Sequence, residues 1–262
     1  ILNQLNTFLK KKIAYPLHEP YFDKNDAKAV SKAFSSTYVS TVGPSIKSFE
    51  KAIAKYCGSK YAVATNSGTS AIHISLLTLG IKRKDEILVP AFTFVGTINA
   101  IMYSSAIPHF VDSSIEKKGI DIDKLDLYLK KIIKRKRNYI YNKNTGNRIG
   151  AIMPVHVFGH PCQIDKVIAL GKKYNLPIIE DAAESLGSKY KKKHCGTFGA
   201  LGCLSFNGNK IITTGSGGVI LTNNKNMAKK AKHLSMVAKK KHRWLFIHDE
   251  VGFNYRLPNL NA

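Results

Sequence analysis

The chain has 262 residues, of which 44% are hydrophobic and 22% are charged, and 41 Lys and Arg against 17 Asp and Glu give a formal net charge of +24. The apolar content excludes a disordered chain, and the length suffices for one large domain or two smaller ones with a buried core. No apolar run reaches the roughly 18–20 residues of a membrane-spanning helix, and residues 1–12 lack the apolar core of a signal peptide.

The first half of the chain alternates helix and strand patterns. Apolar residues at Phe49, Ile53 and Tyr56 have the spacing of a helix that ends near Gly58. The elements predicted next are a strand over 61–65, a turn over 66–69, a helix over 70–79, a strand over 86–89, a helix over 93–103, a strand over 107–111 and a helix with a basic outer face over 125–133.

The second half continues this alternation. Residues 137–148 are polar and rich in turn formers, which predicts a surface loop. The remaining predictions are strands over 151–155, 176–180, 201–206 and 219–222, and helices over 165–174 and 226–237. Helices interleaved with short, wholly apolar strands are typical of an α/β fold. We therefore expect a mainly parallel sheet of about seven strands between two layers of helices.

The positive charge has three explanations. A basic chain can bind nucleic acid, but 35 of its 41 basic residues are Lys, and nucleic-acid readers favour Arg. Short clusters of Lys along the whole chain favour a solvated basic surface, and an anionic small substrate is the third explanation. Four scattered cysteines with no C-x-x-C pair are typical of a reducing cytosol, so we expect a cytoplasmic protein.

Three segments at predicted strand ends carry candidate chemistry, because ligands bind at such ends in open α/β sheets. The turn over 66–70 precedes a helix whose free N–H groups could cradle a phosphate, although an ordinary N-cap has the same pattern. The acidic segment 180–184 either faces a cationic ligand group or caps a helix. In the segment 205–210, Lys210 lies among Gly and small polar residues and is a candidate Schiff-base lysine.

Together, a phosphate cradle, a carboxylate for a pyridinium nitrogen and a lysine for an aldehyde are the parts that a pyridoxal phosphate enzyme requires. The carboxylate keeps the ring nitrogen protonated, so that the ring can accept electrons from a carbanion. The order along this chain is phosphate turn, Asp181 and then Lys210. That order is the one found in fold-type I aminotransferases.

Seven ordered motifs in the segment from about Pro16 to Ala262 resemble the DegT/DnrJ/EryC1/StrS family of pyridoxal phosphate-dependent nucleotide-sugar aminotransferases. They are T-N-S-G-T-S-A-I-H (65–73), V-P-A-F-T-F-V-G-T-I-N-A-I (89–101), P-V-H-V-F-G-H-P (154–161), E-D-A-A-E-S-L-G (180–187), G-T-F-G-A-L-G-C-L-S-F-N-G-N-K (196–210), T-T-G-S-G-G (213–218) and G-F-N-Y-R-L-P-N-L-N-A (252–262). The segments 16–22 and 38–43 look most like the branch that aminates UDP- or GDP-linked 4-keto-6-deoxy-N-acetylglucosamine and feeds legionaminic acid and bacillosamine-type sugars.

The resemblance implies two catalytic residues. Lys210 would form the Schiff base with the cofactor and later carry a proton between substrate and cofactor, and Asp181 would pair with the pyridinium nitrogen. The other residues that would bind the cofactor are Gly68, Thr69 and Ser205 at the phosphate, Phe94 on the ring, Glu184 near the ring hydroxyl and Asn254 at the phosphate of a neighbouring subunit. A homodimer with shared active sites is therefore implied.

His156 ends a predicted strand and either approaches cofactor or substrate or is a structural histidine with satisfied nitrogens. Ser40 and Thr41 would contact the substrate. No metal site is expected, because Gly159 interrupts any helix that could place His156 and His160 on one face.

The implied reaction is transamination of a nucleotide-activated 4-keto-6-deoxy (N-acetyl)hexosamine to its 4-amino sugar, with glutamate as donor, for surface glycan synthesis. A non-catalytic regulatory or sensor member of the same fold and a basic nucleic-acid-binding protein are the alternatives. The expected divisions are an N-terminal arm over 1–25, a large cofactor domain over 26–245 and the start of a small C-terminal domain over 246–262. The abrupt end at Ala262 predicts that the rest of this small domain is missing.

Overall fold

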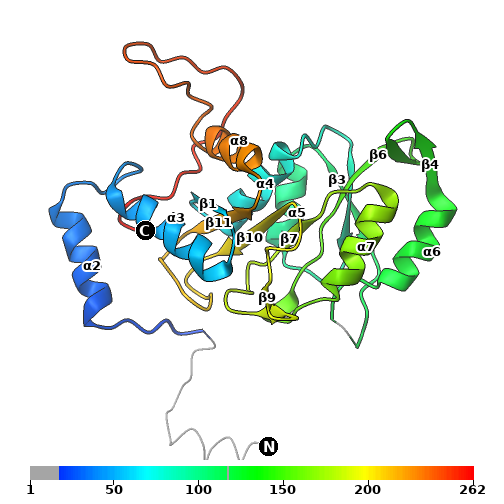
Figure 1. Ribbon diagram of the computed structural model, residues 1–262, viewed down its shortest axis with the longest axis horizontal. Helices are drawn as coiled ribbons and strands as arrows, with labels where there is room; N and C mark the ends of the chain where they lie inside the picture. Colours follow the sequence, from blue (N-terminus) through cyan, green and yellow to red (C-terminus); the bar gives the residue numbers. More distant parts are fainter. Residues whose placement is uncertain (1–17, 117) are drawn as a thin grey trace, which may run out of the picture.

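The computed structural model describes residues 18–116 and 118–262, so most of the predicted arm over 1–25 lies outside the described residues. A mixed sheet runs through the centre of the described chain (Figure 1). In spatial order its strands are β1 (Tyr61–Thr65), β11 (Gly218–Thr222), β10 (Leu201–Ser205), β7 (Ile179–Asp181), β6 (Arg148–Ile152), β2 (Glu86–Pro90) and β3 (Ile107–Val111). The parallel bridges Ile152–Ile178 and Val155–Asp181 connect the β7 and β6 portions.

The predicted mainly parallel sheet is confirmed. Strand β11 runs antiparallel to both β1 and β10, whereas β10 with β7, β2 with β6 and β2 with β3 are parallel pairs. The predicted strand over 151–155 is shifted, because β6 begins at Arg148 and only bridge contacts continue to Val155.

Helices cover both faces of the sheet. The helices on one face are α4 (Gly68–Thr78), α5 (Val95–Tyr103) and α8 (Lys225–Ser235), and those on the other face are α3 (Pro44–Cys57), α6 (Ile122–Ile132) and α7 (Ile164–Tyr174). Successive residues of a strand point to opposite faces, so in β2 Ile87 and Val89 join the α4–α5–α8 core while Leu88 joins the α6–α7 core. Helix α2 (Lys24–Ser35) buries no residue and lies apart from this body (Figure 1).

The helix ends follow the sequence signals. Pro44 occupies the first turn of α3, and Gly58, at φ +70°, ends it in the left-handed conformation. The Ser67 hydroxyl accepts the Ser70 N–H and starts α4. The predicted basic face is confirmed on α6, whose last turn exposes Lys130 and Lys131 beside buried apolar residues. Among the residues that the structure describes, no helix combines the length and apolar character needed to span a membrane.

The prediction of a surface loop over 137–148 is wrong. Strands β4 (Ile133–Lys136) and β5 (Tyr139–Asn142) form an antiparallel hairpin, and β5 also pairs with β6. Ile140 and Asn142 are buried while Tyr139 is exposed, so side chains of higher and lower exposure alternate along a strand near the sheet edge. The polar, turn-forming residues on either side of Tyr139–Asn142 hid this strand. The remaining short elements are η1 (Val157–Gly159), β8 (Lys189–Tyr190) and β9 (Lys193–His194).

A buried carboxylate, Glu86, lies at the start of β2. It accepts hydrogen bonds from Asn142 and Thr145, and its Oε2 lies 2.7 Å from His109 Nδ1. Burial alone would raise the pKa of Glu86, but the hydrogen bonds from Thr145, Asn142 and His109 hold it below its usual value. This network ties the turn between β5 and β6 to the amino end of β2.

Candidate functional site

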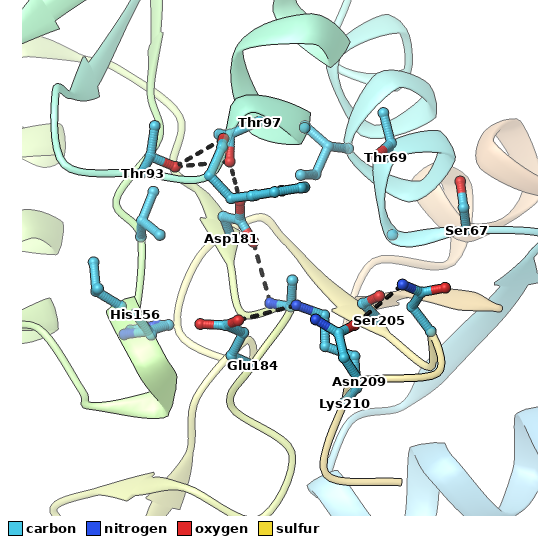
Figure 2. A pocket seen from close by; sticks show the side chains of 18 of the residues that line it. Ser67, Thr69, Thr93, Thr97, His156, Asp181, Glu184, Ser205, Asn209 and Lys210 are labelled. Carbon is cyan, nitrogen blue, oxygen red and sulfur yellow. Dashed lines mark hydrogen bonds and ion pairs between the residues drawn. The ribbon is translucent and has the colours of Figure 1, made fainter. Parts of the chain in front are cut away.

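A cavity of about 490 Å³ lies at the carboxyl ends of β2, β7 and β10 (Figure 2). The parallel strands bring together segments that follow them in the sequence. The predicted site residues that line this cavity are Gly68, Thr69, Phe94, His156, Asp181, Glu184, Ser205 and Lys210.

Asp181 ends β7 and is 5% exposed. Its Oδ2 accepts a hydrogen bond from Thr97 Oγ1 at 2.6 Å, and its Oδ1 accepts one from the Ala183 N–H at 3.1 Å. Burial raises the pKa of Asp181, while Thr97, Ala183 and the nearby Lys210 act in the opposite direction. A buried carboxylate with this environment is suited to a cationic group of a ligand.

Lys210 lies in the loop after β10, and its side chain is only 12% exposed. Its Nζ lies 3.0 Å from Glu184 Oε1 and 6.0 Å from the centroid of the Phe94 ring. Glu184 Oε2 accepts the backbone N–H of Phe158, a residue at φ +51°. One carboxylate therefore holds both the lysine and the loop opposite it.

The first turn of α4 approaches the end of β10 closely. A Cβ on Gly68 would lie 2.9 Å from Ser205 Cβ, which is closer than real side chains come. The absence of a side chain at Gly68 therefore lets the helix N-terminus lie against Ser205. The part of the cavity lined by Gly68, Thr69 and Ser205 is called the Gly68 space below. Free backbone N–H groups and the helix dipole make such a space suitable for a phosphate.

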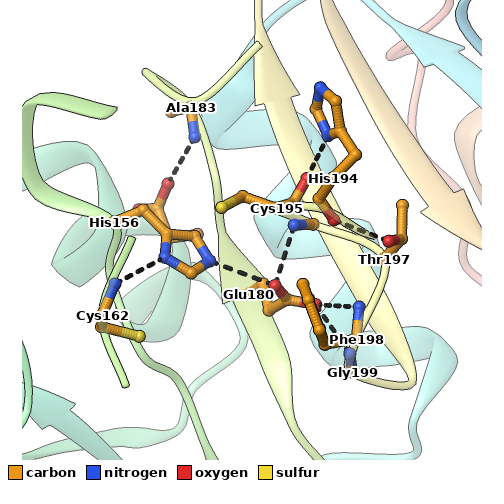
Figure 3. A network of polar contacts seen from close by, with 11 residues as sticks. His156, Cys162, Glu180, Ala183, His194, Cys195, Thr197, Phe198 and Gly199 are labelled. Carbon is orange, nitrogen blue, oxygen red and sulfur yellow. Dashed lines mark hydrogen bonds and ion pairs between the residues drawn. The ribbon is translucent and has the colours of Figure 1, made fainter. Parts of the chain in front are cut away.

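Both ring nitrogens of His156, which also lines the cavity, have hydrogen-bond partners (Figure 3). Its Nδ1 accepts the Cys162 N–H at 3.2 Å, so Nε2 carries the proton and donates to Glu180 Oε2 at 3.1 Å. The Glu180 carboxylate is fully buried and also accepts the backbone N–H groups of Gly196, Phe198 and Gly199. Of the two readings of His156, this geometry favours the histidine with satisfied nitrogens.

Three predicted site residues lie outside the cavity. The Ser40 carbonyl accepts the Asn259 N–H, and Thr41 lines a different hollow beside Glu50. The backbone of Asn254 forms an isolated antiparallel β-bridge with Met236, the residue that follows α8. In this single chain Asn254 cannot serve the cavity, and its expected role in a neighbouring subunit stays a prediction.

Two cavity residues whose hydroxyls form a hydrogen-bond chain to Asp181 were missed from the sequence. Thr97 bonds Asp181, and Thr93 lies 2.8 Å from Thr97, hydroxyl to hydroxyl. Both lie in the quoted motif 89–101, four residues apart at the start of a helix, and that spacing was the available signal. Their partner, Asp181, is 84 residues away, which no local pattern reveals.

Gly218 explains how β11 can approach the start of α4. A Cβ at this position would lie 2.2 Å from the Ser67 carbonyl oxygen. We expect Gly218→Ala to destabilise the protein by about 1–3 kcal/mol, because backbone must shift, and to weaken phosphate binding at Gly68. Denaturant unfolding measures the first effect. The control is Gly208→Ala, whose Cβ meets no atom within 4 Å; equal losses in both variants would contradict the prediction.

The donor set fits pyridoxal phosphate. The Gly68 space suits its phosphate, the Asp181 carboxylate suits a protonated ring nitrogen, and Lys210 supplies an amine for its aldehyde. The exposed ring of Phe94 lines the cavity wall, with its centroid 6.0 Å from Lys210 Nζ.

Comparisons with known proteins agree with this fit. The chain is 38% identical to GDP-perosamine synthase of Escherichia coli O157:H7, over 94% of this chain and 63% of that protein. It is 39% identical to the putative pyridoxal phosphate-dependent aminotransferase EpsN of Bacillus subtilis, over 94% of this chain and 61% of that protein. The structure of Helicobacter pylori PseC, an aminotransferase involved in the biosynthesis of pseudoaminic acid, matches with a TM-score of 0.81 and 29% identity, over 96% of this chain and 63% of that one.

The chain thus spans about three fifths of the length of these relatives. The match to the family itself covers residues 20–262, nearly all of the chain. The chain therefore belongs to the DegT/DnrJ/EryC1/StrS aminotransferase family, whose enzymes depend on pyridoxal phosphate.

Proposed function

We propose that the protein transfers an amino group to the 4-keto carbon of a nucleotide-activated 6-deoxy (N-acetyl)hexosamine. The observation that carries this proposal is the gathering of Asp181, Lys210 and the Gly68 space around one cavity. Glutamate is the proposed donor, surface glycan synthesis the proposed use of the product, and the cytosol the proposed location. The net charge of +24 would favour an anionic nucleotide-sugar substrate.

Lys210, Asp181 and Glu184 each have a distinct role in this proposal. Bound pyridoxal phosphate supplies an aldehyde that carries the amino group and a ring that accepts electrons. Lys210 Nζ would hold the aldehyde carbon and, once released, move a proton at the carbon that bears the amino group. Asp181 would keep the ring nitrogen protonated. Glu184 Oε1, 3.0 Å from Nζ, is placed to hold the proton that the lysine must lose before it can attack.

Borohydride trapping and a substrate panel test this function. Protein incubated with pyridoxal phosphate and reduced with borohydride should carry one phosphopyridoxyl group on the peptide containing Lys210. With glutamate and a panel of UDP- and GDP-linked 4-keto-6-deoxy sugars, mass spectrometry should detect the 4-amino product and 2-oxoglutarate. Cofactor binding without any turnover would favour the regulatory alternative, and salt-sensitive DNA binding without cofactor absorbance would favour a nucleic-acid-binding protein.

We also propose a homodimer in which Asn254 faces the partner's cavity. The segment after α8 projects from the body (Figure 1) and leaves Trp244 and Phe246 74% and 80% exposed, as interfaces often do before assembly. Sedimentation velocity should show a dimer for the wild type and a monomer for the double variant Trp244→Ser, Phe246→Ser. Ile115→Ser, at a residue that is 96% exposed, is the matched control and should leave the dimer intact. A dimeric double variant would contradict the proposed interface.

A further inference from the structure

The carboxylate of Asp181 has a buried hydroxyl partner, Thr97. The Thr97 hydroxyl lies 2.6 Å from Asp181 Oδ2, and the two residues are 2% and 5% exposed. Hydrogen bonds to an ionised group in a buried setting are short and strong. The Ala183 N–H occupies the other oxygen, so both carboxylate oxygens are oriented.

Thr93 continues the hydrogen-bond chain behind Thr97, and the ionised carboxylate of Asp181 sets the direction of both bonds. The Thr93 hydroxyl oxygen lies 2.8 Å from that of Thr97. An ionised carboxylate only accepts hydrogen bonds, so Thr97 donates its single proton to Asp181 and its oxygen accepts the proton of Thr93. The chain from Thr93 through Thr97 to Asp181 is visible in Figure 2. Such a chain polarises each bond and strengthens the last one.

Other groups face Asp181 from the elements packed around it. They are His156 after β6, Lys210 after β10 and the Cys203 thiol on β10. Burial is the strongest influence on Asp181 and raises its pKa, and the Thr97 hydrogen bond is the strongest of those that lower it. Thr97 also belongs to the first turn of α5, which Phe94 caps. The start of one helix thus carries both the Phe94 ring, which lines the cavity, and the hydroxyl that donates to the Asp181 carboxylate.

We propose that Thr97, oriented by Thr93, is a positioning residue that keeps Asp181 ionised and aimed at the ring nitrogen of the cofactor. The inference rests on the proposed function, because that function places a pyridinium nitrogen opposite Asp181. Among the described residues, the hydrogen-bond partners of the Thr97 hydroxyl are Asp181 and Thr93.

The first test uses cofactor-free protein. Carbon-13 NMR follows the carboxyl carbons of labelled aspartates, and Asp181→Asn identifies the signal of Asp181. We expect Thr97→Val to raise the titration midpoint of Asp181 by about one pH unit, a tenfold change in its acid constant, because the ionised form loses a donor. Thr97→Ser keeps the hydroxyl and should restore the wild-type midpoint. Thr78→Val removes a buried hydroxyl that has no hydrogen-bond partner among the described residues, and should leave the midpoint unchanged.

The second test measures pyridoxal phosphate affinity by absorbance as a function of pH. In Thr97→Val, the pH below which affinity falls should move upward by the same interval, whereas a purely structural defect would weaken affinity equally at every pH. An unmoved midpoint in Thr97→Val, or an equal shift in Thr97→Ser, would overturn the proposal. If the wild type binds no pyridoxal phosphate while the midpoint still moves, the proposed function fails together with the ring-nitrogen role of Asp181, and the effect of Thr97 on that carboxylate stands.

Discussion

Lys210→Ala is expected to lose the borohydride-stable attachment of pyridoxal phosphate and to slow amino transfer on the order of 10⁴-fold. The Lys210 ammonium is nearly buried, held by Glu184 and directed into the cavity. No other lysine in the described ranges lines this cavity, so no second amine can take its place. Reduction with borohydride followed by peptide mass spectrometry measures the attachment, and product formation measures the rate.

The control for this experiment is Lys191→Ala. Lys191 pairs with Asp165 at the surface, and its side chain is 71% exposed, so its loss should change neither attachment nor rate. A Lys210→Ala protein that still carries a reduced phosphopyridoxyl group, or still turns over at the wild-type rate, would refute the assignment.

Glu180→Gln is expected to destabilise the fold by about 3–5 kcal/mol, the cost of leaving a buried polar network unpaired. Glu180 accepts four donors in a fully buried position, two on each oxygen. The amide nitrogen of Gln donates, so two of these four donors would face a donor instead of an acceptor. The measurement is the free energy of unfolding from denaturant titration.

The matched control is Glu250→Gln. Glu250 lies 3.7 Å from His233 and is 46% exposed, so its replacement should cost less than about 1 kcal/mol. Equal stability of the two variants would show that the Glu180 network adds little to the fold. A second readout, near-ultraviolet circular dichroism, should report whether the loop over 196–199 loses its packing in Glu180→Gln.

Most of the fold could be predicted because its elements carry local signals. The apolar run over 61–65 that predicts a strand, and the glycine at position 58 that ends a helix, are signals carried by a few neighbouring residues. The hairpin of β4 and β5 was missed because the basic residues of β4 and the polar turn formers around β5 favour a loop, and because the pairing of β5 with β6 depends on a partner strand. A polar sequence indicates exposure to solvent. It does not distinguish a loop from a hairpin at the edge of a sheet, which is also exposed.

The candidate site likewise contains residues that could be predicted from local sequence and residues that could not. Asp181 and Lys210 could be found because residue type, position after a strand and motif order agree on them. Thr97 could not, because its significance arises only when α5 packs beside the end of β7. Glu184 was predicted as a site residue, but its two contacts, Lys210 and the Phe158 backbone, come from separate loops and could not be predicted.

The buried Glu86 network has a practical consequence for mutational work. Glu86 and the cavity lie at opposite ends of β2, a strand of five residues, and so are separated by about 13 Å along it. Substitutions separated by more than about 10 Å that share no partner contribute additively to the free energy of unfolding. Substitutions around Glu86 and His109 can therefore raise or lower the free energy of unfolding without affecting the cavity. The Asp181 and Lys210 variants can then be compared in backgrounds of different stability.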